Sequence, residues 1–333
     1  MKDGMFVFDA VVHLHDTTKT NELSPIAAVT AGQIQANTDH WGSSKMPPNP
    51  AMRDGMTDVE QATRWLFEES DTDMAMAQTV PLLEYWKTGF SPADRQAELA
   101  RACPGRVAFC GGVDPLFQGI RGAQTEMERQ FYELGAKSFK FYQAQSRSVK
   151  WAADDAAIAY PLYEKAQELG VTFLQFHKGF PLGDQSMEDL RALDIQRAAL
   201  DFPDLTFGLH HFGYPYIDET IAVAASRPNV VLVMPLWFNQ YMVQPRLMLK
   251  ILGQALFNIG PERLLYASEG FLWPRLQTFI DMWAELEMPA DLQEGYGYPA
   301  LDRNIKELIF GRNLARILDI DVPSGASHLA PST

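Results

Sequence analysis

Residues 6–16, FVFDAVVHLHD, join a strand-forming run to three side chains that can bind a metal. The run is rich in Phe and Val, which favour strands, so it predicts a buried strand. Side chains alternate between the two faces of a strand, which places Asp9, His13 and His15 on one face. Buried polar groups need partners, and one divalent metal can serve several of them. The pattern therefore indicates a metal site, with two ordinary histidines near a strand end as the alternative.

Chemically competent side chains also end several later apolar runs. His177 ends VTFLQFH, His210 and His211 end the run that begins at residue 205, and Glu269 follows RLLYAS. Lys140 lies in a fourth run, KSFKFY. Of the seven histidines, five fall at three predicted strand ends. Imidazoles and carboxylates that meet at one rim form a ligand set for Zn, Mn or Fe.

Eight short apolar runs separated mostly by helical patterns predict an α/β protein with a parallel sheet covered on both faces. The expected strands are residues 5–12, 74–80, 106–113, 137–142, 171–177, 205–211, 229–234 and 263–268. Eight such units favour a (β/α)8 TIM barrel, and no Gly-rich dinucleotide-binding turn follows a strand. We expect one domain over residues 1–321 and a loose polar tail over 322–333.

A long polar segment over residues 17–57 is expected to be a loop after the first strand. Loops of this length within a compact domain often act as active-site lids or subunit contacts. It carries His40 and Trp41, which could reach a substrate, although a solvated histidine is the ordinary alternative. The segment also favours a homo-oligomer.

The composition restricts the possible partners. The chain has 333 residues, 47% of them hydrophobic, and a formal net charge of −14, which argues against binding to nucleic acid or an anionic membrane surface. There are two cysteines, Cys103 and Cys110, and such sparse use fits a reducing cytoplasm. No signal-peptide core and no membrane-spanning apolar run are found. We expect a cytoplasmic protein with a small-molecule substrate.

At this point the sequence resembles the amidohydrolase superfamily, in particular its branch of metal-dependent hydrolases and nonoxidative decarboxylases. That branch has D-x-H-x-H on strand one, a His ending strand five, H-x-G ending strand six and S-D-x-P ending strand eight. The matching segments here are QFHKGFP with His177, HHFGYP with His211, and ASEGF with Glu269. The motifs are short, but their order is kept over nearly the whole chain.

Two departures from the family pattern leave alternatives open. If Asp9 is the family's Asp, Val11 replaces the first His and His13 is the second. If His13-Leu14-His15 is the family's H-x-H, the Asp has moved. On strand eight, Glu269 replaces the usual Asp and is longer by about one methylene, which changes how it can chelate or bridge.

The resemblance implies one or two divalent ions, Zn, Mn or Fe, and a bound water of lowered pKa. Glu269 is then a ligand or a general base, and His211 is favoured over the adjacent His210 because only one of them can face the barrel centre. A strand-four lysine is carboxylated in parts of the superfamily, but a buried ion pair or a substrate anchor is the plainer interpretation of Lys140. The candidate ligands are Asp9, His13, His15, His177, His211 and Glu269, and the candidate substrate-binding residues are His40, Tyr214, Trp237 and Trp273.

Four functions follow from this resemblance. The first is a hydrolase that directs metal-activated water at an amide, ester or thioester. The first alternative is a nonoxidative decarboxylase of an aromatic acid. The second is a dinuclear iron or iron–manganese oxygenase or thioesterase, which extra carboxylates such as Asp9 and Glu269 would suit and to which Glu84 could add another. The last is a non-catalytic subunit paired with a paralogous chain. The identity and number of the metals would separate the four.

Overall fold

The computed structural model describes residues 1–42 and 46–322. Apart from Val322, the tail predicted over residues 322–333, with His328, lies outside the described residues.

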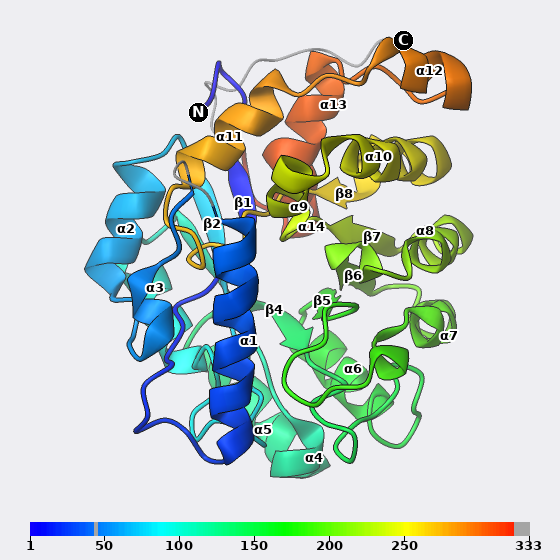
Figure 1. The fold of residues 1–333 in the computed structure, drawn as a ribbon. Helices are drawn as coiled ribbons and strands as arrows, with labels where there is room; N and C mark the ends of the chain where they lie inside the picture. The colour runs from blue at the N-terminus through cyan, green and yellow to red at the C-terminus, as the bar shows by residue number, and fades with distance from the viewer. Residues whose placement is uncertain (43–45, 323–333) are drawn as a thin grey trace.

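Eight parallel strands form a nearly closed barrel, as the sequence predicts (Figure 1). Each strand pairs with the next along the chain. The backbone N–H of Ala10 donates to Tyr266 O at 3.0 Å, so the last unit also meets the first. The strands are β1 (Phe8–Val12), β2 (Met74–Gln78), β3 (Val107–Gly111), β4 (Ala136–Phe141), β5 (Phe173–Phe176), β6 (Thr206–His210), β7 (Val230–Val233) and β8 (Leu264–Leu265).

Helices surround the barrel and fill the connections between strands (Figure 1). The α-helices after the first connection are α2 (Val59–Phe67), α3 (Ala93–Ala102), α4 (Pro115–Gln118), α5 (Ile120–Tyr132), α6 (Tyr160–Glu168), α7 (Leu193–Asp201), α8 (Ile217–Ser226), α9 (Trp237–Val243), α10 (Pro245–Ile259), α11 (Leu276–Glu285), α12 (Ala290–Tyr296), α13 (Arg303–Glu307) and α14 (Asn313–Ile317). Short 3-10 turns are η1 (Pro50–Arg53), η2 (Met187–Leu190), η3 (His211–Gly213) and η4 (Pro261–Arg263), and η5 (Leu308–Arg312) is a π-helical turn. Within the described part of the chain, no helix has both the length and the apolar character needed to cross a membrane.

The segment expected to be a long loop instead contains a helix, α1 (Pro25–Trp41), followed by η1. The expectation of a loop over residues 17–57 is therefore wrong for this stretch. The helix buries Ala27, Thr30, Ile34 and Thr38 at helical spacing. Two of these four are threonines and one is an alanine, so the buried face gives almost no hydrophobic signal in the sequence.

The barrel interior changes character along its length. Its apolar part includes Phe8, Met76, Ala108, Val231 and Leu265, which belong to one buried cluster. Buried polar side chains from β2, β4, β5 and β6 lie in the same barrel, nearer the carboxyl ends of their strands: Gln78, Lys140, Gln175 and His210. The polar end of the barrel is the end at which TIM barrels place their active sites.

Candidate metal and substrate site

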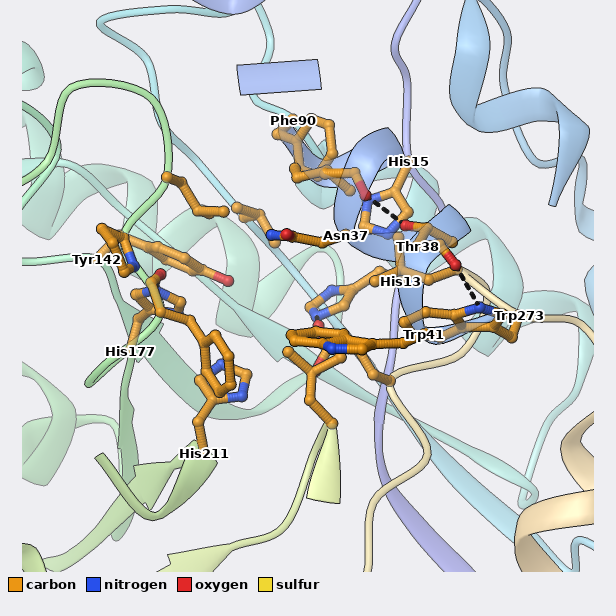
Figure 2. A pocket seen from close by; sticks show the side chains of 18 residues that line it. His13, His15, Asn37, Thr38, Trp41, Phe90, Tyr142, His177, His211 and Trp273 are labelled. Atoms are coloured by element: carbon orange, nitrogen blue, oxygen red, sulfur yellow. Dashed lines mark hydrogen bonds and ion pairs between the residues drawn. The ribbon is translucent and has the colours of Figure 1, made fainter. Parts of the chain in front are cut away.

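A cavity lies at the carboxyl ends of the strands, and α1 contributes one of its walls (Figure 2). Its volume is about 620 Å³ when the space open to solvent is included. The lining residues are His13, His15, Ile34, Asn37, Thr38, Trp41, Val80, Phe90, Tyr142, His177, Phe180, Pro181, Leu182, His211, Leu236, Glu269, Leu272 and Trp273. Four imidazoles and one carboxylate thus share one largely apolar and aromatic space.

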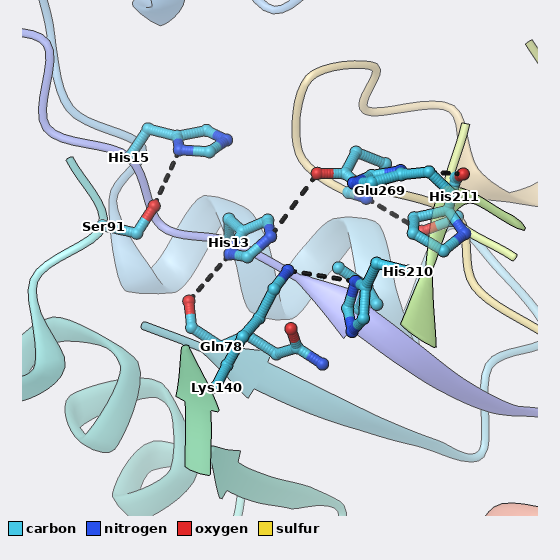
Figure 3. A network of polar contacts seen from close by, with 12 residues as sticks. His13, His15, Gln78, Ser91, Lys140, His210, His211 and Glu269 are labelled. Carbon is cyan, nitrogen blue, oxygen red and sulfur yellow. Dashed lines mark hydrogen bonds and ion pairs between the residues drawn. The ribbon is translucent and has the colours of Figure 1, made fainter. Parts of the chain in front are cut away.

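His13, His15 and Glu269 come from the β1 and β8 ends of the barrel. The Nδ1–H of His13 donates to Gln78 O at 2.7 Å, which leaves its Nε2 facing the Oε1 of Glu269 at 3.5 Å (Figure 3). The Nδ1 of His15 pairs with the Ser91 hydroxyl at 2.8 Å. In both histidines one ring nitrogen is therefore fixed by a neighbour and the other has no hydrogen-bond partner among the described residues, an arrangement that orients an imidazole for a metal.

His177 and His211 come from the β5 and β6 ends. The Nε2–H of His177 donates to Phe180 O at 3.0 Å, and its ring stacks on Tyr142 with centroids 4.7 Å apart. The Nδ1–H of His211 points to Pro235 O at 3.3 Å. The centroids of the two imidazoles are 5.1 Å apart. A second pair of nitrogen donors thus stands in the same cavity.

Left-handed backbone gathers around this cavity. Phe180, His211, Leu236 and Glu269 all have positive φ, at 43°, 61°, 63° and 61°. Residues other than glycine rarely adopt this region, and such strain concentrates at functional sites. At Gly179 the backbone runs so close to Tyr214 that a Cβ would collide with its carbonyl oxygen. The loops after β5 and β6 are therefore locked together beneath His177 and His211.

The orphaned atoms of this set fit a divalent metal. His13 Nε2, His15 Nε2, His177 Nδ1 and Glu269 Oε2 are buried without a hydrogen-bond partner. Such atoms are costly in a folded protein unless something binds them. In residues 1–42 and 46–322, no three His, Cys, Asp or Glu side chains are already close enough together to hold one ion. Metal binding therefore requires these side chains to turn toward a common point.

Burial and neighbouring groups keep the Glu269 carboxylate ionised and the imidazoles of His15, His177 and His211 neutral. Burial alone would raise the pKa of Glu269, but its contact with His13 and its proximity to His211 and the Lys140 ammonium hold that pKa well below its usual range. Burial lowers the pKa of His211 to about 4 and that of His15 and His177 well below 6.5. An ionised carboxylate with neutral imidazoles is the protonation state that metal ligation needs.

Lys140 lies beneath the cavity and does not line it. Its ammonium donates to His210 Nδ1 at 3.0 Å (Figure 3). The Nε2–H of His210 donates in turn to Gln175 Oε1 at 2.9 Å. Gln78 Nε2 donates to the same Gln175 oxygen at 2.9 Å. We call these four residues, Gln78, Lys140, Gln175 and His210, the floor network. Burial lowers the pKa of Lys140 to about 8.

Asp9 is not brought to the cavity. Its Oδ1 accepts the backbone N–H groups of Val11 at 3.1 Å and Ser268 at 3.0 Å, so it ties β1 to the segment after β8. Burial raises its pKa to about 6. The register of β1 against β2 shifts between Asp9 and Val12, so the alternation that would align Asp9 with His13 and His15 is broken.

The expected substrate-binding residues divide into three groups. Trp273 lines the cavity. Tyr214 and Trp237 instead line a smaller neighbouring hollow, and His211 is the one described residue that lines both spaces. His40 is exposed on α1, and the next residue, Trp41, reaches the cavity instead.

Sequence reasoning overlooked Asn37, Thr38 and Tyr142. Tyr142 had a usable signal, since it directly follows β4 at the catalytic end of the barrel. The two residues on α1 had none once that segment was taken for a loop.

Eight parallel strands with clustered imidazoles and a carboxylate at their carboxyl ends define a metal-dependent TIM-barrel enzyme. The chain belongs to the amidohydrolase family, whose model matches residues 13–320. No curated protein matches it in sequence.

Several solved structures share the fold at low sequence identity. An uncharacterised TIM-barrel protein from Bordetella bronchiseptica is 18% identical with a TM-score of 0.69, over 95% of this chain and 99% of that one. A 5-carboxyvanillate decarboxylase from Sphingomonas paucimobilis is 16% identical with a TM-score of 0.60, over 95% and 100%. A dihydroxybenzoic acid decarboxylase from Polaromonas, solved with bound manganese and the inhibitor 2-nitroresorcinol, is 14% identical with a TM-score of 0.61, over 96% and 99%.

Proposed function

We propose that this protein is a metal-dependent hydrolase that directs activated water at a small carbonyl compound, an amide, ester or thioester. The observation that carries the proposal is the set of buried, unpartnered nitrogen and oxygen atoms on His13, His15, His177 and Glu269 around one cavity. A bound divalent ion would supply Lewis acidity to the carbonyl oxygen and would lower the pKa of a water molecule.

The protein's own groups prepare that chemistry. Gln78 O and Phe180 O fix the tautomers of His13 and His177, so that each directs an unprotonated nitrogen away from its backbone partner. The Oε2 of Glu269 is unpartnered and ionised, and can orient a water molecule and accept a hydrogen bond from it. The helix α1 covers part of the site and limits the entry of bulk water.

The residues that line the cavity indicate which class of substrate would fit. Trp41, Phe90, Phe180 and Trp273 provide apolar and aromatic surface. No Lys or Arg lines the cavity among the described residues. A carbon-rich compound whose only charged or strongly polarised group lies at the metal end fits these walls best.

Nonoxidative decarboxylation of an aromatic acid is the second candidate. It is favoured by the same aromatic walls and by the similarity in fold to aromatic-acid decarboxylases. In that reaction the ring would lie between the aromatic side chains, with its carboxylate at the metal end.

One preparation separates these reactions. Protein purified without chelator or added metal is analysed for its elements, then assayed with aryl esters, anilides, thioesters and hydroxybenzoates in water enriched in ¹⁸O. Hydrolysis places ¹⁸O in the carboxylic acid product, whereas decarboxylation releases CO2 and leaves a phenol that carries no ¹⁸O. Two iron equivalents with oxygen consumption would overturn both candidates in favour of an oxygenase.

We also propose that the protein is a homo-oligomer, and light scattering on the same sample tests this.

A further inference from the structure

Two uncharged polar groups enter the cavity from different elements. Tyr142 directly follows β4, and Asn37 lies near the C-terminal end of α1. Figure 2 shows the phenol oxygen and the amide directed into the cavity from the β4 side and the α1 side. Apart from the candidate metal ligands and Thr38, the other lining side chains are apolar or indole. This pair therefore stands out against the walls.

The Tyr142 ring is held firmly while its hydroxyl is unused. The residue is 5% exposed, its ring stacks on His177 with an interplanar angle of 17°, and the Lys140 ammonium lies 5.1 Å from its centroid. No described residue forms a hydrogen bond with its hydroxyl. Of the other buried tyrosines, Tyr85 donates to Asp184 at 2.7 Å and Tyr163 donates to Ala153 O at 2.9 Å, whereas the hydroxyl of Tyr266 is also unpartnered among the described residues but lies outside the cavity.

Asn37 is similarly unused. It lies at the exposed edge of the cavity, and its side chain forms no hydrogen bond within the described residues. The neighbouring Thr38 hydroxyl, by contrast, is occupied by the Ile34 carbonyl of its own helix. An amide offers both donors and an acceptor, so Asn37 can pair with a hydroxyl or a carbonyl.

We propose that Tyr142 and Asn37 select the substrate by binding an uncharged oxygen substituent, a hydroxyl, ether or carbonyl, beside the group that is held at the metal end. A second anionic group is disfavoured there, because no Lys or Arg of the described chain lines the cavity to compensate its burial. Sites built to hydrogen-bond a substituent discriminate strongly against analogues that lack it. The inference rests on the proposed function only in that the metal end anchors the reacting group.

Hydroxamates test the pair without a known substrate, because they chelate divalent metals through their own head group. The Mn²⁺-loaded protein is titrated with benzohydroxamate, with its 2-, 3- and 4-hydroxy derivatives and with 4-carboxybenzohydroxamate. Binding is followed by quenching of tryptophan fluorescence, since Trp41 and Trp273 line the cavity. At least one hydroxy derivative is expected to bind about tenfold more tightly than the parent, as one or two net hydrogen bonds allow. The carboxy derivative is expected to bind most weakly.

Matched variants test whether Tyr142 and Asn37 cause the preference for a hydroxy derivative over benzohydroxamate. Tyr142→Phe and Asn37→Ala should each remove most of the preference for the hydroxy derivative. Both should leave the affinity for Mn²⁺ and benzohydroxamate within about threefold, which corresponds to about 0.65 kcal/mol. The controls are Tyr132→Phe, which removes an exposed phenol, and Gln35→Ala, which removes an amide of the same helix that does not line the cavity. Both controls should keep the preference.

The outcomes separate this inference from the metal centre. Equal affinity for all hydroxamates, or a preference that survives both substitutions, overturns the role of Tyr142 and Asn37 while the metal centre stands. If calorimetry shows no Mn²⁺ binding, the proposed metal centre fails, and this inference fails with it.

Discussion

His210 and His211 are adjacent in the chain, yet they belong to two different regions. His210 lies in the floor network, where both ring nitrogens are paired, one with Lys140 and one with Gln175. His211 lines the cavity above, among side chains with open nitrogens or oxygens. Both regions contain buried histidines, but within the described chain the floor network leaves one buried atom without a partner, Gln78 Oε1, whereas the cavity gathers four, on His13, His15, His177 and Glu269.

Whether buried polar atoms have partners separates residues that stabilise the fold from residues that bind a ligand more reliably than residue type does. A buried network in which nearly every polar atom is paired stabilises one conformation of the barrel. An unpartnered buried polar atom costs about 1–3 kcal/mol, so several of them around one cavity mark a place prepared for a ligand. The predictions below test the division between the two regions, beginning with the largest expected effect.

Replacing Glu269 with Gln should abolish most of the activity. The change keeps the size of the side chain but removes the ionised oxygen at the cavity, so we expect turnover to fall by about 10²–10⁴-fold on the substrate found in the screen above. The melting temperature should change by only a few degrees. An unchanged turnover number would remove Glu269 from the mechanism.

Replacing His177 with Ala should weaken metal binding by about 100-fold or more, since even partners of metal ligands contribute 10–100-fold. Calorimetric titration with Mn²⁺ measures the effect. The matched control is His40→Ala, because His40 is an exposed histidine on α1 that does not line the cavity. Full metal occupancy in the His177 variant would contradict the site assigned here.

Replacing Gln175 with Leu should reduce the stability of the protein and leave its affinity for metal nearly unchanged. The variant leaves the Nε2–H of His210 without its acceptor and removes one partner of Gln78, so the free energy of unfolding should fall by about 2–4 kcal/mol. Urea unfolding of the metal-free protein measures it, with the exposed Gln196→Leu as control. Mn²⁺ affinity should stay within about threefold, and a loss comparable with that of the His177 variant would show that floor and cavity act as one unit.

One side chain from each region, His211 and Lys140, should make the stability depend on pH in two separate windows. The folded-state pKa of His211 is about 4 against an ordinary 6.5, so the unfolded chain binds more protons between these values and stability falls as pH drops through that window. The folded-state pKa of Lys140 is about 8 against 10.5, so by the same sign the stability should rise between pH 8 and 10.5, by about 3 kcal/mol.

Urea midpoints of the metal-free protein against pH test both windows. Lys140→Met should flatten the alkaline rise and keep the acid loss. A retained alkaline rise in that variant would show that another group is responsible.

Most of the barrel could be predicted from the sequence, whereas α1 could not. Each of the eight strands is a short apolar run. A strand that is buried on both faces has a nearly continuous apolar sequence, so it can be recognised without knowledge of its neighbours. The buried face of α1 is made of Ala27, Thr30, Ile34 and Thr38, and its contacts come from loops distant in the chain, such as the Gly183 N–H that donates to Gln33. No local pattern records those contacts, so Asn37 and Thr38 could not be recognised as cavity residues, although Trp41 was expected to reach a substrate.

The sequence by itself determined the barrel, its family and the placement of His13, His15, His177, His211 and Glu269 at strand ends, because these features depend on local hydrophobic patterns and chain order. Only the tertiary structure decided which of the polar groups remain open. The break in register within β1 turns Asp9 toward Ser268, and the left-handed backbone at His211 separates it from His210. Hydrogen-bond satisfaction depends on partners from other strands, so it exists only after the barrel has closed.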